Sequence, residues 1–158
     1  MPVLRPSLPA SPVSRALGAR GFTLVEIMLA LVVMGVLAAV ALPAYQQAVQ
    51  KSRRSDAIAM LTAVQQAQER WRANRTGYAA NLSDLGFSSG QSPKGYYEIA
   101  LSNVAMSTYT VTATPISSGA QAKDSVCAKL GIAVSGGQVS YTSADSASQA
   151  TSSKCWAQ

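Results

Sequence analysis

The sequence predicts an α+β fold in which one long N-terminal helix packs on a small antiparallel β-sheet. Three observations lead to this prediction. An uncharged apolar run from Ile27 to Ala44 continues directly into an amphipathic helical pattern. Segments of alternating apolar and polar residues follow in the second half of the chain, separated by turn residues. Finally, Cys127 and Cys155 bracket a serine-rich tail that could not build a core alone.

The composition limits the possible functions. With 158 residues, the chain has room for one modest domain and an anchor. It has no histidine, which removes the commonest general base and the commonest metal ligand. The sequence shows no phosphate loop, nucleophile elbow or carboxylate cluster, and Asp84 and Glu98 are isolated. We therefore expect a protein that is not an enzyme and that uses no cofactor or metal.

The formal net charge of +6 is unevenly distributed. Arg5, Arg15 and Arg20 lie in the first 21 residues, which contain no acidic residue. Without that stretch, ten Lys and Arg residues face seven Asp and Glu residues, a net charge of +3. The high pI is therefore only weak support for nucleic-acid binding.

The chain changes character abruptly at Phe22, where the apolar part begins. The 18 uncharged residues from Ile27 to Ala44 would form about 27 Å of helix, close to the ~30 Å thickness of the bilayer hydrocarbon. Three interpretations fit such a run. It could be a secretory signal cleaved at Ala39-Val40-Ala41, a plain transmembrane anchor, or a signal that is cut in front of the run.

Glu26 distinguishes these interpretations. A carboxylate near the start of an apolar helix costs a few kcal/mol in lipid unless it has a partner. A discarded signal or a simple anchor gains nothing from it. The apolar run is longer than the usual cleaved signal core, and the helical pattern continues for about thirty residues beyond Ala41. A cut before the run is therefore favoured.

The segment from Gly21 to Glu26, GFTLVE, resembles the prepilin peptidase signature of type IV pilins and pseudopilins. The resemblance implies cleavage between Gly21 and Phe22 and N-methylation of Phe22 as the new N-terminus. It also implies that Glu26 docks the subunit during assembly. A buried carboxylate needs a cation, which the terminal amine of a neighbouring subunit could supply.

The same resemblance divides and orients the chain. It implies a leader at 1–21, a membrane-spanning and then filament-core helix at 22–45, and a globular domain at 46–158. Charge does not settle the orientation independently, because three cations precede the span and three follow it. The family pattern implies a single pass through the inner membrane with a periplasmic globular domain, followed by an extracellular pilus.

Gly35 and Pro43 lie inside the predicted helix. Glycine costs about 1 kcal/mol there, and proline removes a hydrogen bond and kinks the chain. Membrane helices tolerate both residues. The family resemblance instead implies a bend between them as subunits pack, and both interpretations remain open.

Beyond Tyr45 the helical pattern becomes amphipathic. Apolar residues at intervals of three, four and seven are expected to face a core: Ala57, Met60, Leu61, Val64 and Trp71. Residues on the opposite side are expected in solvent: Arg54, Ser55, Thr62, Gln65, Gln66, Glu69 and Arg72. The helix is expected to end between Asn74 and Gly77.

Four strands are expected after a connecting region at 75–94. The first hairpin joins 97–102 to 108–114 through a linker at 103–106. A third strand at about 127–134 turns at a Gly-Gly pair into a shorter strand at 138–142. The amphipathic helix should cover one face of this sheet. Four residues of the connecting region should pack onto the core: Tyr78, Leu82, Leu85 and Phe87.

The two cysteines are most simply interpreted as a disulfide, since the chain carries an export signal. Closing a loop of about 29 residues between Cys127 and Cys155 contributes roughly 3–4 kcal/mol in the loop-closure model. A metal or redox role has little support, because the sequence has no second ligand set and no Cys-x-x-Cys motif.

Downstream features in the same order resemble PilE-type minor pilins. They are Gln68 to Trp71, Gly77-Tyr78, Leu85-Gly86, Thr108 to Pro115, Cys127 to Leu130 and Lys154 to Trp156. The resemblance implies a structural subunit of a type IV pilus, with twitching motility, adhesion or DNA uptake as downstream roles. Its implied partners are other pilins, the prepilin peptidase, the inner-membrane assembly machinery and, before assembly, membrane lipid.

Two alternatives remain. A pseudopilin of a type II secretion system shares the signature, but major pseudopilins resemble one another in a calcium loop that needs clustered oxygen ligands. The C-terminal third here has only Asp124 and Asp145 as acids. A DNA-binding competence pilin is the other, because six cations could contact phosphate or, equally, solvent or anionic lipid heads. These are Lys51, Arg53, Arg54, Arg70, Arg72 and Arg75.

Overall fold

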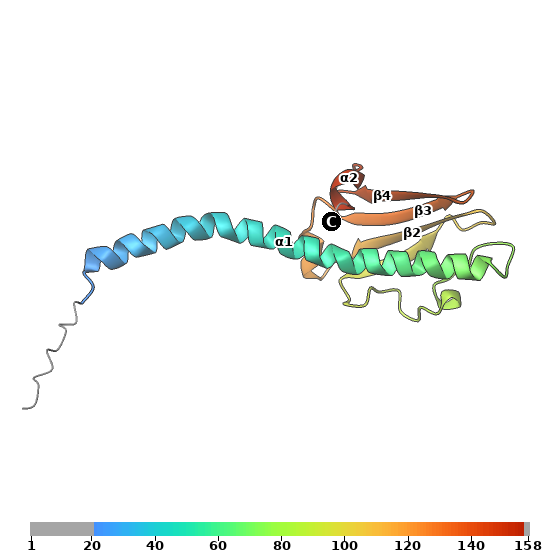
Figure 1. Ribbon diagram of the computed structural model, residues 1–158, viewed down its shortest axis with the longest axis horizontal. Coiled ribbons are helices and arrows are strands. Elements are labelled where there is room, and N and C mark those ends of the chain that lie inside the picture. The colour runs from blue at the N-terminus through green and yellow to red at the C-terminus, as the bar shows by residue number, and fades with distance from the viewer. Residues whose placement is uncertain (1–20, 157–158) are drawn as a thin grey trace, which may run out of the picture. The chain divides into compact units, whose positions relative to one another are not determined.

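The computed structural model describes residues 21–156 (Figure 1). The long helix α1 (Leu24–Arg72) comes first, then the short helix η1 (Ser83–Leu85) and strands β1 (Tyr97–Ser102) and β2 (Thr108–Pro115). The short helix η2 (Ala120–Lys123), strands β3 (Lys129–Ser135) and β4 (Gln138–Ala144) and the short helix α2 (Ser152–Cys155) follow. Apart from Gly21, the expected leader at 1–21 lies outside the described residues.

The chain divides into two compact units, one ending at Val40 and the other beginning at Ala41. In the first unit, every residue from Gly21 to Val40 is exposed, although nearly all are apolar. α1 is long and apolar enough over this part to cross a membrane. The described apolar residues of the first unit, from Phe22 to Val40, are therefore not buried by the rest of the chain.

The second unit contains a four-stranded antiparallel sheet with the strands in sequence order, β1-β2-β3-β4. The later part of α1 lies across one face of this sheet (Figure 1). The core between them contains apolar residues from α1 and from alternate strand positions: Ala57, Met60, Leu61, Val64, Tyr97, Ile99, Tyr109, Val111, Ala113, Leu130, Ile132 and Val134. The predicted α+β fold is thus confirmed.

The turn between β3 and β4 follows from the Gly136-Gly137 pair. Both residues have positive φ, 58° and 85°, as a tight hairpin with matching strand twist requires. β4 is as long as β3, so the expectation of a shorter fourth strand at 138–142 is wrong. The added pairs join Ser143 and Ala144 to β3, and the tail supports them, because Thr151 N donates to Ser143 O.

The third strand starts later than expected. β3 begins at Lys129 and not near Cys127, because the amide of Cys127 donates to the Asp124 carboxylate instead of to a neighbouring strand. The sequence shows the alternation of the strand, but not this side-chain acceptor.

The core-facing stripe of α1 matches the expectation except at its end. Trp71 is only partly buried, and Gln68 is fully buried instead. The Gln68 amide donates to Ala79 O (2.9 Å) and accepts from Ala79 N (2.8 Å), so the buried polar group is satisfied. Hydrophobic periodicity cannot show this exchange of bonds with a loop.

The connecting region packs as expected. Tyr78 is buried, with its ring 4.6 Å from that of Tyr109, while Leu82, Leu85 and Phe87 are partly buried against the core. α1 ends at Arg72, slightly before the predicted limit. This region therefore closes the core beside the helix.

Candidate functional site

The predicted cleavage segment is accessible at the start of α1. Gly21 and Phe22 precede the helix, and the Phe22 side chain is 77% exposed. Thr23 caps the helix, because its Oγ1 accepts from the amide of Glu26 at 3.2 Å. The two residues on either side of the expected cut are thus outside the helical hydrogen-bond ladder, where a peptidase could reach the bond.

Glu26 lies in the first turn of α1 and is exposed. An acid in the first turn interacts favourably with the helix dipole. Within the part of the chain that the structure describes, Glu26 takes part in no ion pair.

α1 continues through both Gly35 and Pro43 without a break in its assignment. A Cβ added to Gly35 would meet no heavy atom within 4 Å, so packing within this chain does not require glycine there. The bend expected at these two residues stays a prediction.

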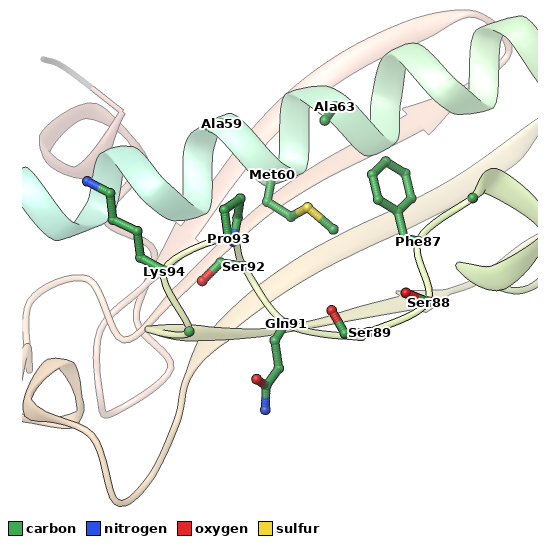
Figure 2. Close-up of a pocket in the computed structure, with 12 residues that line it drawn as sticks. Ala59, Met60, Ala63, Phe87, Ser88, Ser89, Gln91, Ser92, Pro93 and Lys94 are labelled. Carbon is green, nitrogen blue, oxygen red and sulfur yellow. The ribbon is translucent and has the colours of Figure 1, made fainter.

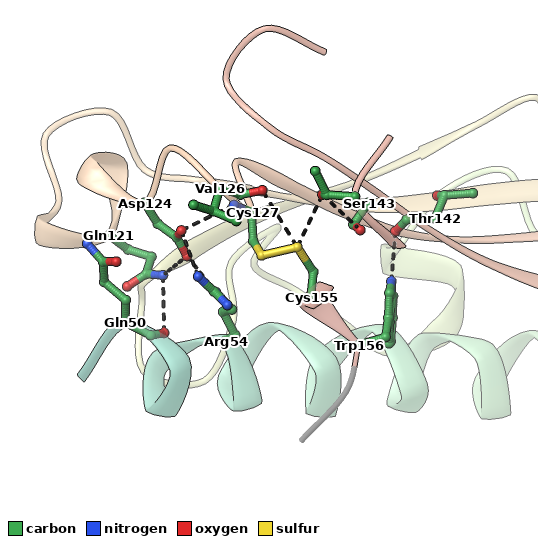
Figure 3. Close-up of a disulfide and its surroundings, with 11 residues drawn as sticks. Gln50, Arg54, Gln121, Asp124, Val126, Cys127, Thr142, Ser143, Cys155 and Trp156 are labelled. Atoms are coloured by element: carbon green, nitrogen blue, oxygen red, sulfur yellow. Dashed lines mark hydrogen bonds and ion pairs between the residues drawn. A yellow bond between two sulfur atoms is a disulfide. The ribbon is translucent and has the colours of Figure 1, made fainter. Parts of the chain in front are cut away.

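A buried ion pair ties α1 to the segment before β3 (Figure 3). Arg54 holds Asp124 with two parallel bonds, Nε to Oδ2 at 2.6 Å and Nη2 to Oδ1 at 2.8 Å. The side chain of Asp124 is 0% exposed and that of Arg54 is 14% exposed. Gln121 Nε2 also donates to Asp124 Oδ2 at 3.0 Å. Such a bidentate, hydrogen-bonded arrangement offsets the cost of burying both charges.

The ion pair corrects one expectation. Arg54 was expected in solvent and among the residues that could contact phosphate, but its guanidinium is occupied by Asp124. Arg54 lies seven residues before Leu61, so it falls beside the core stripe of α1, and the segment that carries Asp124 supplies a buried partner for its charge. No local pattern indicates the path of that segment.

The disulfide lies next to this ion pair (Figure 3). Cys127 and Cys155 are joined at a sequence separation of 28, and both are buried. Trp156 then donates its indole N–H to Thr142 O at 2.9 Å and packs near the ring of Tyr141. The predicted disulfide is confirmed, and it fixes the C-terminal tail to the sheet.

The remaining candidate cations separate into two groups. The first, which we call the distal cluster, contains Arg70, Arg72 and Arg75 near the C-terminal end of α1. The guanidinium of Arg75 lies 3.4 Å from the ring centre of Trp71, and that of Arg72 lies 4.8 Å from that of Tyr78. Arg72 also donates to the Tyr78 hydroxyl at 2.8 Å. Stacking holds these arginines in fixed positions on aromatic faces.

The second group, the basal collar, contains Lys51, Arg53, Lys123 and Lys154. Sequence analysis identified the two α1 members but missed Lys123 on η2 and Lys154 on α2. The structure brings them together, since Arg53 and Lys123 line one groove and Lys51 and Lys154 line another. A search for cations outside α1 could have found the two lysines, but not their position.

An open groove of about 700 Å³ runs between α1 and the loop at 86–95 (Figure 2). Met60 from the helix and Phe87 from the loop point into it, whereas Gln91 points away. Lys94 is the charged residue of its lining. Three serines and Gln91 are the other polar residues of the lining.

Burial affects two core tyrosines. It raises the pKa of Tyr97 to about 12 and raises the pKa of Tyr109 still further, because each phenolate would be poorly solvated in the core. Neither hydroxyl has a hydrogen-bond partner among the described residues. Across residues 21–156, no three Cys, Asp or Glu side chains are grouped so that they could hold a metal ion.

Comparisons with known proteins support the same regions. Residues 43–131 match the family described as type IV minor pilin ComP, DNA uptake sequence receptor, and residues 17–42 match the prokaryotic N-terminal methylation motif. A fimbrial protein of Neisseria meningitidis is 35% identical over 99 residues, which are 63% of this chain and 56% of that protein.

Two further relatives are similar in the same way. The type IV major pilin protein PilE1 of Neisseria gonorrhoeae is 37% identical over 101 residues, 63% of this chain and 59% of that protein. Fimbrial protein Q of Moraxella bovis is 41% identical over 66 residues, 39% of this chain and 42% of that protein. The matches thus span less than two thirds of the length of these relatives.

Proposed function

Because this chain belongs to the ComP family of type IV minor pilins, we propose that it is a subunit of a type IV pilus. The apolar half of α1 first anchors the subunit in the membrane and is later buried among other pilin helices in the filament. The role is assembly and needs no catalytic step by this chain. The match to the family and the N-terminal methylation motif support the proposal.

One observation carries the proposal most directly. Every residue from Gly21 to Ala48 is exposed, and most of those before Tyr45 are apolar. Such a surface cannot remain in water, so it requires lipid or other helices. Moving it from lipid to a helix bundle exchanges one dry environment for another. Close helix packing and ion pairs must then give the transfer its direction.

Processing prepares this transfer. We propose that the prepilin peptidase cuts between Gly21 and Phe22 and that Phe22 becomes the methylated N-terminus. The chain then divides into the leader 1–21, the helix 22–45 and the globular domain 46–158. The amine at Phe22 of one subunit pairs with Glu26 of a neighbour inside the filament. The proposed orientation puts the leader in the cytoplasm and the globular domain in the periplasm.

The docking role of Glu26 can be tested separately from processing. Glu26→Ala should leave leader cleavage largely intact, but reduce incorporation into sheared filaments at least tenfold. Glu98→Ala, which removes an exposed strand carboxylate, is the matched control and should incorporate normally. Normal incorporation of Glu26→Ala would refute the docking role.

The cleavage site has its own test. Gly21→Val should leave an uncut precursor, because the peptidase signature requires a small residue before the cut. Gly21→Ala is the milder control. Mass spectrometry of the exported wild type should show a methylated Phe22 at the front, whereas an N-terminus at Leu42 would support an ordinary signal peptide instead.

A second function, DNA binding, is favoured by one specific observation. The matched family is described as a DNA uptake sequence receptor, and the distal cluster presents three arginines, two of them over aromatic rings. Guanidinium groups bind phosphate with two donors, and aromatic faces can stack with bases. We therefore propose that DNA contacts the distal cluster and not the Arg54 region, whose guanidinium is paired.

A gel-shift assay with the soluble domain 46–158 tests this assignment. All core residues lie between Ala57 and Trp156, so this domain retains its complete core and its disulfide. Arg70→Gln/Arg72→Gln/Arg75→Gln should abolish binding at low salt and lower the salt dependence by about three charges. Absence of wild-type binding at low salt would remove the DNA function.

A further inference from the structure

The basal collar surrounds α1 where the helix enters the globular unit. Lys51 and Arg53 are two positions apart on the helix, so they point to different sides of it. Lys123 from η2 lines a groove with Arg53, and Lys154 from α2 lines a groove with Lys51. Three separate elements thus contribute cations to one end of the unit.

The collar is close to the end of the apolar span. Lys51 follows Ala44 by seven residues, which is about 10 Å of helix at 1.5 Å per residue. Lys51 then lies outside the hydrocarbon, near enough for its long side chain to reach the lipid headgroups. The distance is also about one Debye length, so salt does not fully screen the attraction. Tyr45, which is 69% exposed, lies between the span and the collar. Tyrosine is enriched at this depth, where its ring meets the headgroups.

Neighbouring carboxylates do not cancel the collar. Asp124 is neutralised by Arg54, and Asp56 is buried and accepts from the amide of Lys94. Asp145 accepts from the amides of Ala147 and Gln149 within its own turn. Against four cations, the described acids nearby that have no ion-pair partner are the buried Asp56 and the partly buried Asp145, which lies in the loop bonded to Ser125. Among the described residues, a net positive charge remains at this end of the unit.

We propose that the basal collar binds the headgroups of anionic lipids while the subunit is in the membrane, an inference that rests on the proposed membrane anchoring. Each cation near an anionic surface strengthens binding roughly fivefold. The collar holds the globular domain against the bilayer, and these contacts must be broken when the subunit leaves for the filament. The span gives the anchor, and the collar sets the position of the domain above it.

DNA is the competing partner for a basic surface, and the composition of the two groups separates them. Three of the four collar cations are lysines, which act as point charges. The fourth, Arg53, lies over the ring of Tyr96 at 5.2 Å. The distal cluster contains only arginines, two of them over aromatic rings. Lipid phosphates require charge at a fixed depth, whereas DNA recognition gains from stacked guanidinium groups.

Vesicle sedimentation with the soluble domain 46–158 tests the proposal without the span. At low salt, wild type should bind vesicles of phosphatidylcholine with 30% phosphatidylglycerol, but not pure phosphatidylcholine vesicles. Lys51→Gln/Lys123→Gln/Lys154→Gln should weaken anionic binding by about a hundredfold. The distal variant Arg70→Gln/Arg72→Gln/Arg75→Gln carries the same charge change and should keep most of it. Circular dichroism checks that each variant is folded.

The outcomes separate the partners. Equal binding to neutral and anionic vesicles, no binding to either, or an equal loss in both triple variants would overturn the collar as a lipid site. If the collar variant lost DNA binding but kept vesicle binding, the basal collar would be a nucleic-acid surface instead of a lipid site. Incorporation of the full chain into filaments is measured in a separate experiment. A failure of the proposed pilus role can therefore be told apart from a failure of the lipid site.

Discussion

The two halves of α1 treat apolar residues in opposite ways. From Leu24 to Val40, every residue is exposed within the chain, including Leu31 at 60%. From Ala57 onward, apolar residues such as Leu61 are 0% exposed under the sheet. The second half of α1 therefore buries its apolar side chains against the sheet of its own chain. The first half needs an external partner to bury them. The first half of α1 therefore needs an apolar environment, lipid or other helices, that its own described residues do not provide.

The carboxylates repeat the contrast. Asp124 is fully buried and held by Arg54, Gln121 and the amide of Cys127. Glu26 lies on an apolar segment and has no ion-pair partner within the described residues. The globular unit thus neutralises Asp124 internally, whereas the described part of the N-terminal segment supplies no cation for Glu26. Four predictions test this comparison.

Breaking the internal ion pair should have the largest effect. Asp124→Ala leaves the Arg54 guanidinium largely buried without its partner, so we expect a loss of about 3–5 kcal/mol in the free energy of unfolding. Urea unfolding of the domain 46–158 measures it. Glu98→Ala, on an exposed strand position, should change stability by less than about 0.5 kcal/mol. An equally small change in the free energy of unfolding for the two variants would show that the Arg54–Asp124 ion pair does not stabilise the domain.

The disulfide should come next. Cys127→Ser/Cys155→Ser should lower the free energy of unfolding by about 3–4 kcal/mol, because the unfolded chain regains the freedom of a 28-residue separation. Reduced wild type should match the double variant in the same urea titration. A variant as stable as the oxidised protein would mean that the tail holds to β4 without the bond.

A matched pair of leucines tests the two halves of α1 directly. Leu61→Ala should destabilise the globular unit by about 3 kcal/mol, since it creates a cavity in the core. Leu31→Ala should leave its unfolding unchanged. Tryptophan fluorescence of the full chain in detergent reports both, because Trp71 and Trp156 lie in the globular unit. Equal losses of stability in the two variants would show that both halves of α1 contribute to the core of the globular unit.

The smallest expected effect depends on pH. The pKa of Tyr97 is raised from 10.0 to about 12, so the folded state keeps a proton that the unfolded state releases above pH 10. This contribution is complete below pH 10 and is lost as pH rises from 10 towards 12, by at most about 1.4 kcal/mol per unit. Tyr97→Phe should therefore lose less stability between pH 9 and pH 11 than wild type. Parallel curves for the two proteins would contradict this assignment.

Local patterns predicted most of the secondary structure. The alternation in Tyr97 to Ser102 and the Gly136-Gly137 pair are governed by neighbours in sequence, and the structure agrees there. Arg54 and Gln68 differ from the expectation for another reason, because a loop beyond the helix supplies the partner of each. Trp71 instead lies under the guanidinium of Arg75, just past the end of α1.

The candidate sites divide in the same way. Gly21, Phe22 and Glu26 form a contiguous motif, which one sequence suffices to identify. The basal collar joins Lys51 and Arg53 to Lys123 and Lys154, about seventy to one hundred residues away. No periodicity links such positions, so only the folded chain could group them.

By itself, the sequence determined the anchor, the processing motif, the order of helix and strands and the pairing of its two cysteines. The first three follow from hydrophobic runs and turn residues, which act between neighbours in the sequence. The disulfide follows because the chain has only two cysteines. Tertiary structure alone decided which charges are neutralised and which remain available. That outcome depends on where loops pass, because a carboxylate neutralises a cation only when folding brings the two within a few ångströms.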